Sequence, residues 1–152
     1  LINANRNIEH WRAFGVPVIG DTIEGFLGPL AGIHAGLTAC TTRWMQVVPC
    51  DSPFIPIDLT SRLARQVEKE HASIAVVRTD SGLQPVFALI DRNLLPSLES
   101  YLRAGSRKID RWYESVAAVA VDFEDAEAFA NINTQQELEL ASATRAISPD
   151  PI

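Results

Sequence analysis

The sequence predicts an α/β domain in which a mainly parallel sheet carries helices on both faces. Strand-like and helix-like segments alternate along most of the chain, which is typical of sheets whose strands are joined by crossover helices. The 152 residues suit one domain with a sizeable core. A composition of 47% apolar and 21% charged residues indicates a globular protein rather than a disordered one.

The first half of the chain contains three expected strands, because apolar runs end there at polar residues or at glycine and proline. Pro29 suits the first turn of a helix, and the small residues that follow it allow that helix to pack closely on a sheet. In order, the expected elements are a strand over 1–5, a short helix over 6–14, a strand over 16–21, a loop over 22–28, a helix over 29–40 and a strand over 43–49.

The second half contains the clearest helix, since Leu59, Leu63 and Val67 recur every four residues. A turn at 80–82 separates two strands, and Thr134 with Glu137 has the spacing of a capping box. The expected elements are helices over 57–72, 94–105 and 107–114, strands over 73–79, 84–90 and 115–123, and a last segment over 131–146 in which Thr134 caps the final helix. We expect one domain over residues 1–146 and a loose tail over 147–152.

Charge and composition exclude several classes of protein. A formal net charge of −6 argues against a broad basic face that grips nucleic acid. The sequence contains no run of about 18 apolar residues, which a membrane span would need, and no signal peptide is visible. We therefore expect a cytoplasmic protein whose Cys40 and Cys50 are reduced thiols.

Polar residues follow three of the expected strands. Asn3 and Asn5 follow the first, Asp21 the second and Asp51 the third. Ligands of parallel sheets bind beyond the carboxyl ends of the strands, so we expect these residues to meet along one edge. Asp51, in a turn stiffened by prolines, has the ligand type that Mg²⁺ prefers when phosphates complete its coordination shell. A turn acid that caps a backbone N–H is the structural alternative.

Three further groups have both a functional and a structural interpretation. GPLAG, over 28–32, opens a helix whose N–H groups suit an anion, although Gly-Pro pairs also mark ordinary loops. Asn131 and Asn133 share one side of an extended segment and suit a metal-bound phosphate, or form Asx turns. Arg107 and Lys108 suit a phosphorylated substrate, or belong to a solvated face.

The motifs NANR, GPLAG, PCDSPFIP and NINTQQEL, in this order and spacing, resemble the molybdenum cofactor guanylyltransferases. These enzymes are nucleotidyltransferases with a three-layer Rossmann-like fold, and the resemblance covers essentially the whole chain. It implies GMP transfer from GTP to molybdopterin, with Mg²⁺ and release of pyrophosphate. It also implies a monomer that works with molybdenum-insertion proteins and molybdoenzyme chaperones.

The resemblance assigns roles to individual residues. Asp51 matches the catalytic acid that binds Mg²⁺ near the nucleotide, and Asn3 and Asp21 match positions that contact the guanine nucleotide. The glycines of GPLAG match a loop at the active site: Gly28 at the nucleotide and Gly32 at the substrate. The same match places Asn131 and Asn133 near the reaction centre, and Arg107 and Lys108 are candidates for contacts with the substrate.

The family also opens with a Gly-rich phosphate loop of the type LAGGxxxRMGxDK, which this sequence does not contain. By comparison with the family, about 50 residues precede Leu1, which fits the usual size of such a domain. We therefore expect the 152-residue chain alone to lack a central strand and the phosphate loop. Such a chain should not catalyse GMP transfer, and its unpaired strand edges should lower its solubility.

Three alternatives remain open at this point. One is a cytidylyltransferase that acts on the same pterin, although PCDSPFIP favours guanine. A second is a sugar-phosphate nucleotidyltransferase of the same fold. The third is a non-catalytic module that binds the pterin product or a partner protein.

Overall fold

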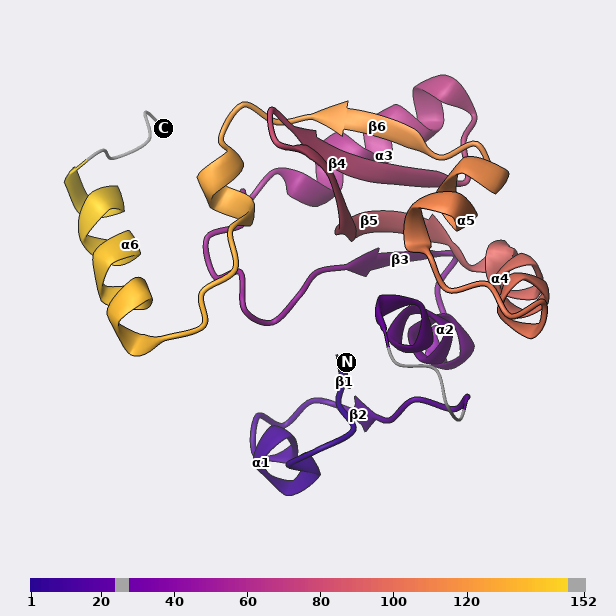
Figure 1. The fold of residues 1–152 in the computed structure, drawn as a ribbon, viewed down its shortest axis with the longest axis horizontal. Coiled ribbons are helices and arrows are strands. Elements are labelled where there is room, and N and C mark those ends of the chain that lie inside the picture. Colours follow the sequence, from indigo (N-terminus) through magenta and orange to yellow (C-terminus); the bar gives the residue numbers. More distant parts are fainter. Residues whose placement is uncertain (24–27, 148–152) are drawn as a thin grey trace.

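The computed structural model describes residues 1–23 and 28–147, and it arranges them around two sheets (Figure 1). A four-stranded sheet has the strand order β3-β5-β4-β6, and a separate two-stranded sheet pairs β1 with β2. The strands are β1 (Ile2–Asn3), β2 (Val18–Ile19), β3 (Trp44–Val47), β4 (Ile74–Thr79), β5 (Gly82–Asp91) and β6 (Val119–Asp122).

The α/β fold class is confirmed, but the larger sheet is mixed and not mainly parallel as expected. Strand β5 is antiparallel to both β3 and β4, whereas β4 pairs parallel with β6 and β1 pairs parallel with β2. The predicted turn between β4 and β5 explains why these two strands are antiparallel. Only Asp80 and Ser81 separate the two strands, and parallel strands need a crossover of a dozen or more residues. Gly82 has a φ of +113°, which suits glycine at this turn.

The expected helices are present, with ends displaced by a few residues. The described part of the chain contains α1 (Ile8–Arg12), α2 (Pro29–Ala39), α3 (Leu59–Glu70), α4 (Leu95–Arg103), α5 (Ile109–Ser115), α6 (Gln135–Ile147) and the 3₁₀ turns η1 (Arg92–Leu94) and η2 (Ala126–Phe129). Within the expected loop over 22–28, residues 24–27 lie outside the described residues. Helix α6 extends to Ile147, one residue past the expected end of the domain, and the rest of the tail, 148–152, also lies outside.

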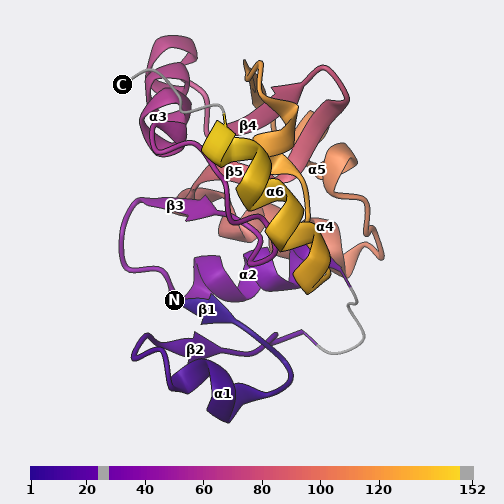
Figure 2. The same ribbon diagram turned by 90° about the vertical axis from the view of Figure 1, so that its left-hand side faces the viewer.

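The larger sheet is the middle of three layers, because successive residues of β4 point to opposite faces. Ile74 and Val76 belong to a cluster with α2, α4 and α5, whereas Ala75 and Val77 belong to a cluster with α3 and η2. Figure 2 shows α3 and α5 on opposite sides of β4. Burying a large apolar side chain such as that of Leu63, which is fully buried, contributes about 1.5–3 kcal/mol.

Helix α2 contacts strands of both sheets, namely β1, β2 and β3. Two glycines allow this close approach. A Cβ atom on Gly32 would lie 2.7 Å from the Oδ1 of Asn3 in β1, and one on Gly36 would lie 2.8 Å from the Sδ of Met45 in β3. The small residues of this helix therefore pack on a sheet as predicted, and they join the two sheets into one body.

The capping box predicted before α6 is confirmed. The Oγ1 of Thr134 accepts a hydrogen bond from the backbone N–H of Glu137 at 3.1 Å. In return, the Oε2 of Glu137 accepts from the backbone N–H of Asn133 and of Thr134. In Figure 1, α6 lies at one end of the molecule, away from α4 and α5. Nowhere in residues 1–23 and 28–147 is a helix long and apolar enough to cross a membrane.

Candidate active site

The first polar cluster forms where β1 and β2 end. Asn3 pairs with Ile19 in this parallel ladder, so Asn5 and Asp21, each two residues further on, come side by side. The carboxylate of Asp21 accepts hydrogen bonds on both oxygens, from the Nδ2 of Asn3 at 3.0 Å and from the Nδ2 of Asn5 at 2.8 Å. The backbone N–H of Asp21 donates to the Oδ1 of Asn5 at 2.8 Å. We call Asn3, Asn5 and Asp21 the strand-end triad.

The strand-end triad holds a carboxylate in one orientation. Each amide donor uses one lone pair, and a carboxylate has about four acceptor sites, so Asp21 can still accept hydrogen bonds from a ligand. Asp21 is half-buried, which leaves it accessible. The arrangement is suited to a ligand that presents N–H or O–H donors, such as a nucleobase or a ribose.

The two candidate glycines of the GPLAG segment lie at the start of α2. Gly28 precedes the helix with a φ of +149°, a backbone conformation that side chains rarely adopt, and Pro29 occupies the first helical turn as predicted. Gly32 lies one turn further along and contacts Asn3 of the strand-end triad. Gly32 therefore has a packing role that sets how closely α2 approaches this triad.

The second cluster joins two segments far apart in the chain. The carbonyl oxygen of Asp51, in the loop after β3, accepts a hydrogen bond from the backbone N–H of Ile132 at 2.7 Å. The Oγ of Ser52 donates to the Oδ1 of Asn131 at 3.1 Å, across 79 positions of sequence. Ser52 is only 5% exposed, so this contact is sheltered from water. We call these four residues the Asp51 junction.

The Asp51 junction leaves the acid's side chain available. In the described part of the chain, the structure places no hydrogen-bond donor on the Asp51 carboxylate, which is half-buried. Asn133 follows the junction, and its backbone N–H is used by the capping box of α6. A carboxylate that is held by its backbone but has open oxygens suits a cation.

The donor set for a metal is small. Among residues 1–23 and 28–147, no group of three or more His, Cys, Asp or Glu side chains could hold a metal ion. A single carboxylate nevertheless fits Mg²⁺, because this ion keeps several water ligands and commonly takes only one or two carboxylates plus substrate phosphates. Asp51 meets that requirement.

Arg107 and Lys108 lie on the connection between α4 and α5, not in either cluster. The Nη1 of Arg107 donates to the carbonyl oxygens of Ser106 at 2.8 Å and of Leu102 at 3.3 Å, so its guanidinium caps the end of α4. The carbonyl of Lys108 accepts from the hydroxyl of Tyr101 at 2.8 Å. Both side chains are exposed, and a role in substrate binding stays a prediction.

Two residues of the clusters had no role assigned from sequence, although Asn5 was expected at the same sheet edge as Asn3 and Asp21. Asn5 ends an expected strand, but its bond to Asp21 depends on the register between β1 and β2. Ser52 lies inside the PCDSPFIP motif, and only its burial distinguishes it from an ordinary turn serine. A signal for Asn5 was present in the NANR motif, where it repeats Asn3 at the two-residue period of a strand.

Comparison with known proteins places this chain in a family. The model of the MobA-like NTP transferase domain matches residues 1–119. The chain belongs to this family. It is 50% identical over 145 residues to the molybdenum cofactor guanylyltransferase of Cupriavidus metallidurans, covering 92% of this chain and 71% of that protein. The corresponding protein of Polynucleobacter asymbioticus is 45% identical over 147 residues, covering 94% of this chain and 74% of its own length.

Solved structures confirm the fold of this MobA-like chain. The molybdopterin-guanine dinucleotide biosynthesis protein A of Archaeoglobus fulgidus superposes with a TM-score of 0.74 at 23% identity, over 95% of this chain and 76% of that one. The 4-diphosphocytidyl-2C-methyl-D-erythritol synthase of Anaerococcus prevotii gives a TM-score of 0.72 at 13% identity, over 96% and 80%. The chain is therefore a nucleotidyltransferase of molybdenum cofactor biosynthesis, as its motifs predict.

Proposed function

We propose that this MobA-like protein transfers GMP from GTP to molybdopterin, forming the guanine dinucleotide cofactor and releasing pyrophosphate. The Asp51 junction carries the proposal. It ties an acid after β3, with its carboxylate open, to the segment of Asn131, and the matching family members are named for guanylyl transfer. Delivery of the product to molybdenum-insertion proteins and molybdoenzyme chaperones belongs to the same proposal.

The chemistry requires positioning more than acid–base catalysis. An oxygen of the acceptor's terminal phosphate attacks the α-phosphorus of GTP, and the bond from that phosphorus to the oxygen shared with the β-phosphate breaks. Phosphate is ionised at neutral pH, so the nucleophile needs no strong general base. The barrier comes from bringing anions together and from charge on the leaving pyrophosphate.

The residues of this chain divide that task. Asp51 would hold Mg²⁺ through its carboxylate, and a bound Mg²⁺ neutralises charge on the phosphates. The backbone bond from Ile132 and the buried contact between Ser52 and Asn131 keep the Asp51 loop in place. The strand-end triad would accept hydrogen bonds from the guanine nucleotide and fix its orientation.

The test is an assay of pyrophosphate release by the full-length protein with molybdopterin, Mg²⁺ and either GTP or CTP. We expect turnover with GTP and much slower turnover with CTP. Replacement of the acid in Asp51→Ala should remove turnover while the protein stays folded. Preferred use of CTP would establish the cytidylyltransferase alternative, and normal turnover by Asp51→Ala would refute the role of this acid.

A further inference from the structure

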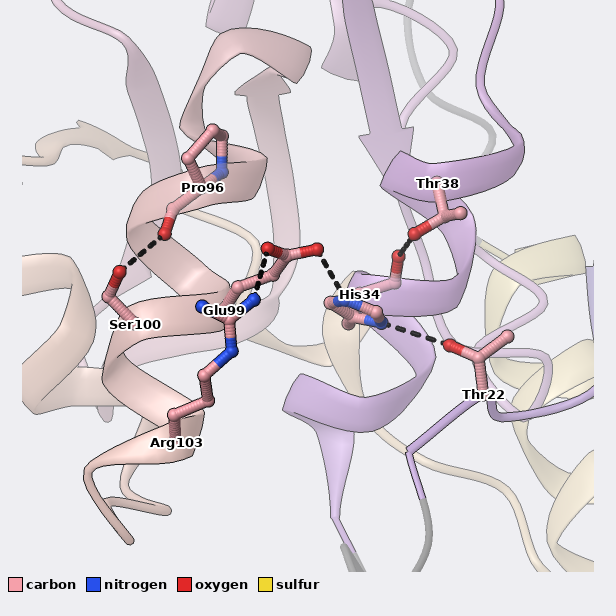
Figure 3. A network of polar contacts seen from close by, with 7 residues as sticks. All are labelled: Thr22, His34, Thr38, Pro96, Glu99, Ser100 and Arg103. Atoms are coloured by element: carbon pink, nitrogen blue, oxygen red, sulfur yellow. Dashed lines mark hydrogen bonds and ion pairs between the residues drawn. The ribbon is translucent and has the colours of Figure 1, made fainter.

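A buried histidine on α2 connects the segment that follows β2 to α4 (Figure 3). His34 lies on α2 and is only 7% exposed. Its Nδ1 lies 3.1 Å from the Oγ1 of Thr22, the residue directly after Asp21. Its Nε2 lies 3.5 Å from the Oε1 of Glu99 on α4. One imidazole ring therefore contacts the segment that follows β2 with one nitrogen and a neighbouring helix with the other.

Glu99, the partner of His34 on α4, is itself fixed by an ion pair. The other oxygen of Glu99, Oε2, accepts a hydrogen bond from the Nη2 of Arg103, one helical turn along α4, at 2.9 Å. The Glu99 side chain is about one-third exposed, so it is partly sheltered. A carboxylate at Nε2 favours the tautomer with its proton on that nitrogen, which leaves Nδ1 to accept from the Thr22 hydroxyl.

We propose that His34 is a positioning residue for the nucleotide site, which it serves by holding Thr22 and thereby the orientation of Asp21. The inference rests on the proposed function, because it assumes that Asp21 contacts the nucleotide. Thr22 is exposed and follows a two-residue strand, so β2 alone constrains it little. The bond to His34 joins it to α2, which also contacts Asn3 through Gly32. Thr22, the next residue after Asp21, and Asn3, which donates to the Asp21 carboxylate, are thus both fixed against the same helix.

Two substitutions of His34 separate this role from simple core packing. His34→Asn keeps a polar atom near the place of Nδ1, and His34→Gln keeps one near the place of Nε2. Both remove the ring, so both should lower stability to a similar degree. Only the Asn variant retains a partner for Thr22, and we expect its KM for GTP to stay near that of the wild type. In His34→Gln the KM should rise about fivefold with little change in kcat, the size expected for one lost hydrogen bond.

A second pair of substitutions changes Thr22, the exposed partner of His34, and leaves the core undisturbed. Thr22→Ser keeps the hydroxyl and should leave the KM unchanged, whereas Thr22→Val should raise it about fivefold. The matched control is Thr38→Val, which removes a hydroxyl that donates to the His34 carbonyl at 2.8 Å without touching the ring. It should change neither kinetic constant. Equal KM values for Thr22→Val and Thr22→Ser would overturn the proposal.

Hydrogen exchange of the same variants gives a readout that does not depend on catalysis. The backbone N–H of Asp21 is bonded to Asn5, so it reports the order of the segment. We expect faster exchange in His34→Gln and Thr22→Val, and unchanged exchange in Thr22→Ser and Thr38→Val. If the wild type transfers no GMP but the exchange pattern holds, the proposed function fails and the positioning stands. If the wild type is active and exchange is equal in all variants, the positioning by His34 is refuted.

Discussion

Asp21 and Asp51 both follow strands, yet the protein holds them in opposite ways. The carboxylate of Asp21 is fixed by two amide donors, one on each oxygen. Asp51 is fixed by its main chain, through the bond from Ile132, and by its buried neighbour Ser52. Its carboxylate meets no donor among the residues that the structure describes.

The difference shows how one fold can prepare two acids, each after a strand of a different sheet, for different ligands. A carboxylate oriented by amides presents its remaining lone pairs in set directions, which suits hydrogen-bond donors of a nucleotide. A carboxylate with open oxygens on a fixed backbone suits a cation, whose other ligands come from phosphates and water. We therefore expect Asp21 to act in recognition and Asp51 in turnover.

The same chemical change at both acids tests this division, and the larger effect should come from Asp51→Asn. The amide keeps the shape of the side chain but loses the charge that a metal requires. We expect kcat to fall about a hundredfold or more, with a smaller change in the KM for GTP. The measurement is steady-state turnover over a range of Mg²⁺ concentrations. A loss confined to KM would reverse the roles of the two acids.

Asp21→Asn should have the next largest effect, and this effect should fall on the KM for GTP and not on kcat. Two amide donors would then face an amide in place of a carboxylate, so the triad would lose its charge-assisted bonds and its orientation. We expect the KM for GTP to rise about tenfold, with kcat within a factor of about three of the wild type. Titration of GTP binding without acceptor provides an independent measurement. An unchanged affinity would remove Asp21 from the nucleotide site.

A smaller effect is expected from Ser52→Ala, which removes the side-chain contact of the Asp51 junction. The Oδ1 of Asn131 would lose its donor, while the backbone bond between Asp51 and Ile132 would remain. We expect kcat to fall about fivefold, as one lost hydrogen bond predicts. The conservative variant Ser52→Thr retains the hydroxyl and serves as the control. Equal kinetics for the two variants would show that the backbone bond alone fixes the loop.

Tyr113 belongs to the buried cluster with α2 and α4 and to neither polar cluster, so a change there should affect stability alone. Burial, with a smaller contribution from Asp110, raises the pKa of the Tyr113 phenol, whose hydroxyl donates to the Pro85 carbonyl at 2.7 Å. A raised pKa means that this stability is present below the unfolded pKa of about 10 and is lost as the pH rises above it.

Tyr113→Phe should therefore unfold with a weaker dependence on alkaline pH. We expect the wild type to lose about 1.4 kcal/mol per pH unit more than the variant above pH ~10. Urea unfolding of both proteins at pH 8 and pH 11 gives this difference, because the other titrating groups are shared. Parallel losses in the two proteins would contradict the assignment, and GMP transfer at pH 8 should be equal in both.

Local features were predictable from sequence, whereas contacts between distant segments were not. The period of Leu59, Leu63 and Val67 gave the face that α3 buries, and the Thr134–Glu137 spacing gave the capping box. Both depend only on residues within a few positions of one another. The antiparallel β5 follows from the length of its turn, although alternating strands and helices favoured a parallel sheet.

The site was predictable as a set of residues but not as two clusters. The ends of apolar runs predicted that Asn3, Asp21 and Asp51 follow strands, and the structure has Asn3 at the end of β1, Asp21 after β2 and Asp51 in the loop after β3. The pairing of Asn5 with Asp21 depends on register, and that of Ser52 with Asn131 depends on how the whole chain folds back. Helix η2, which lies in that returning segment, was not expected, because its residues show no helical period long enough to recognise.

The two glycines of α2 impose unequal limits on how this protein can drift in evolution. At position 36, an added methyl group would meet the end of the Met45 side chain, which is flexible and can rearrange. At position 32, it would meet the amide of Asn3, which is already committed to Asp21. An alanine at position 36 would therefore be accommodated by Met45, whereas an alanine at position 32 would displace Asn3 and disturb the strand-end triad. Tolerance to substitution along this helix therefore depends on whether the neighbouring side chain can change its conformation.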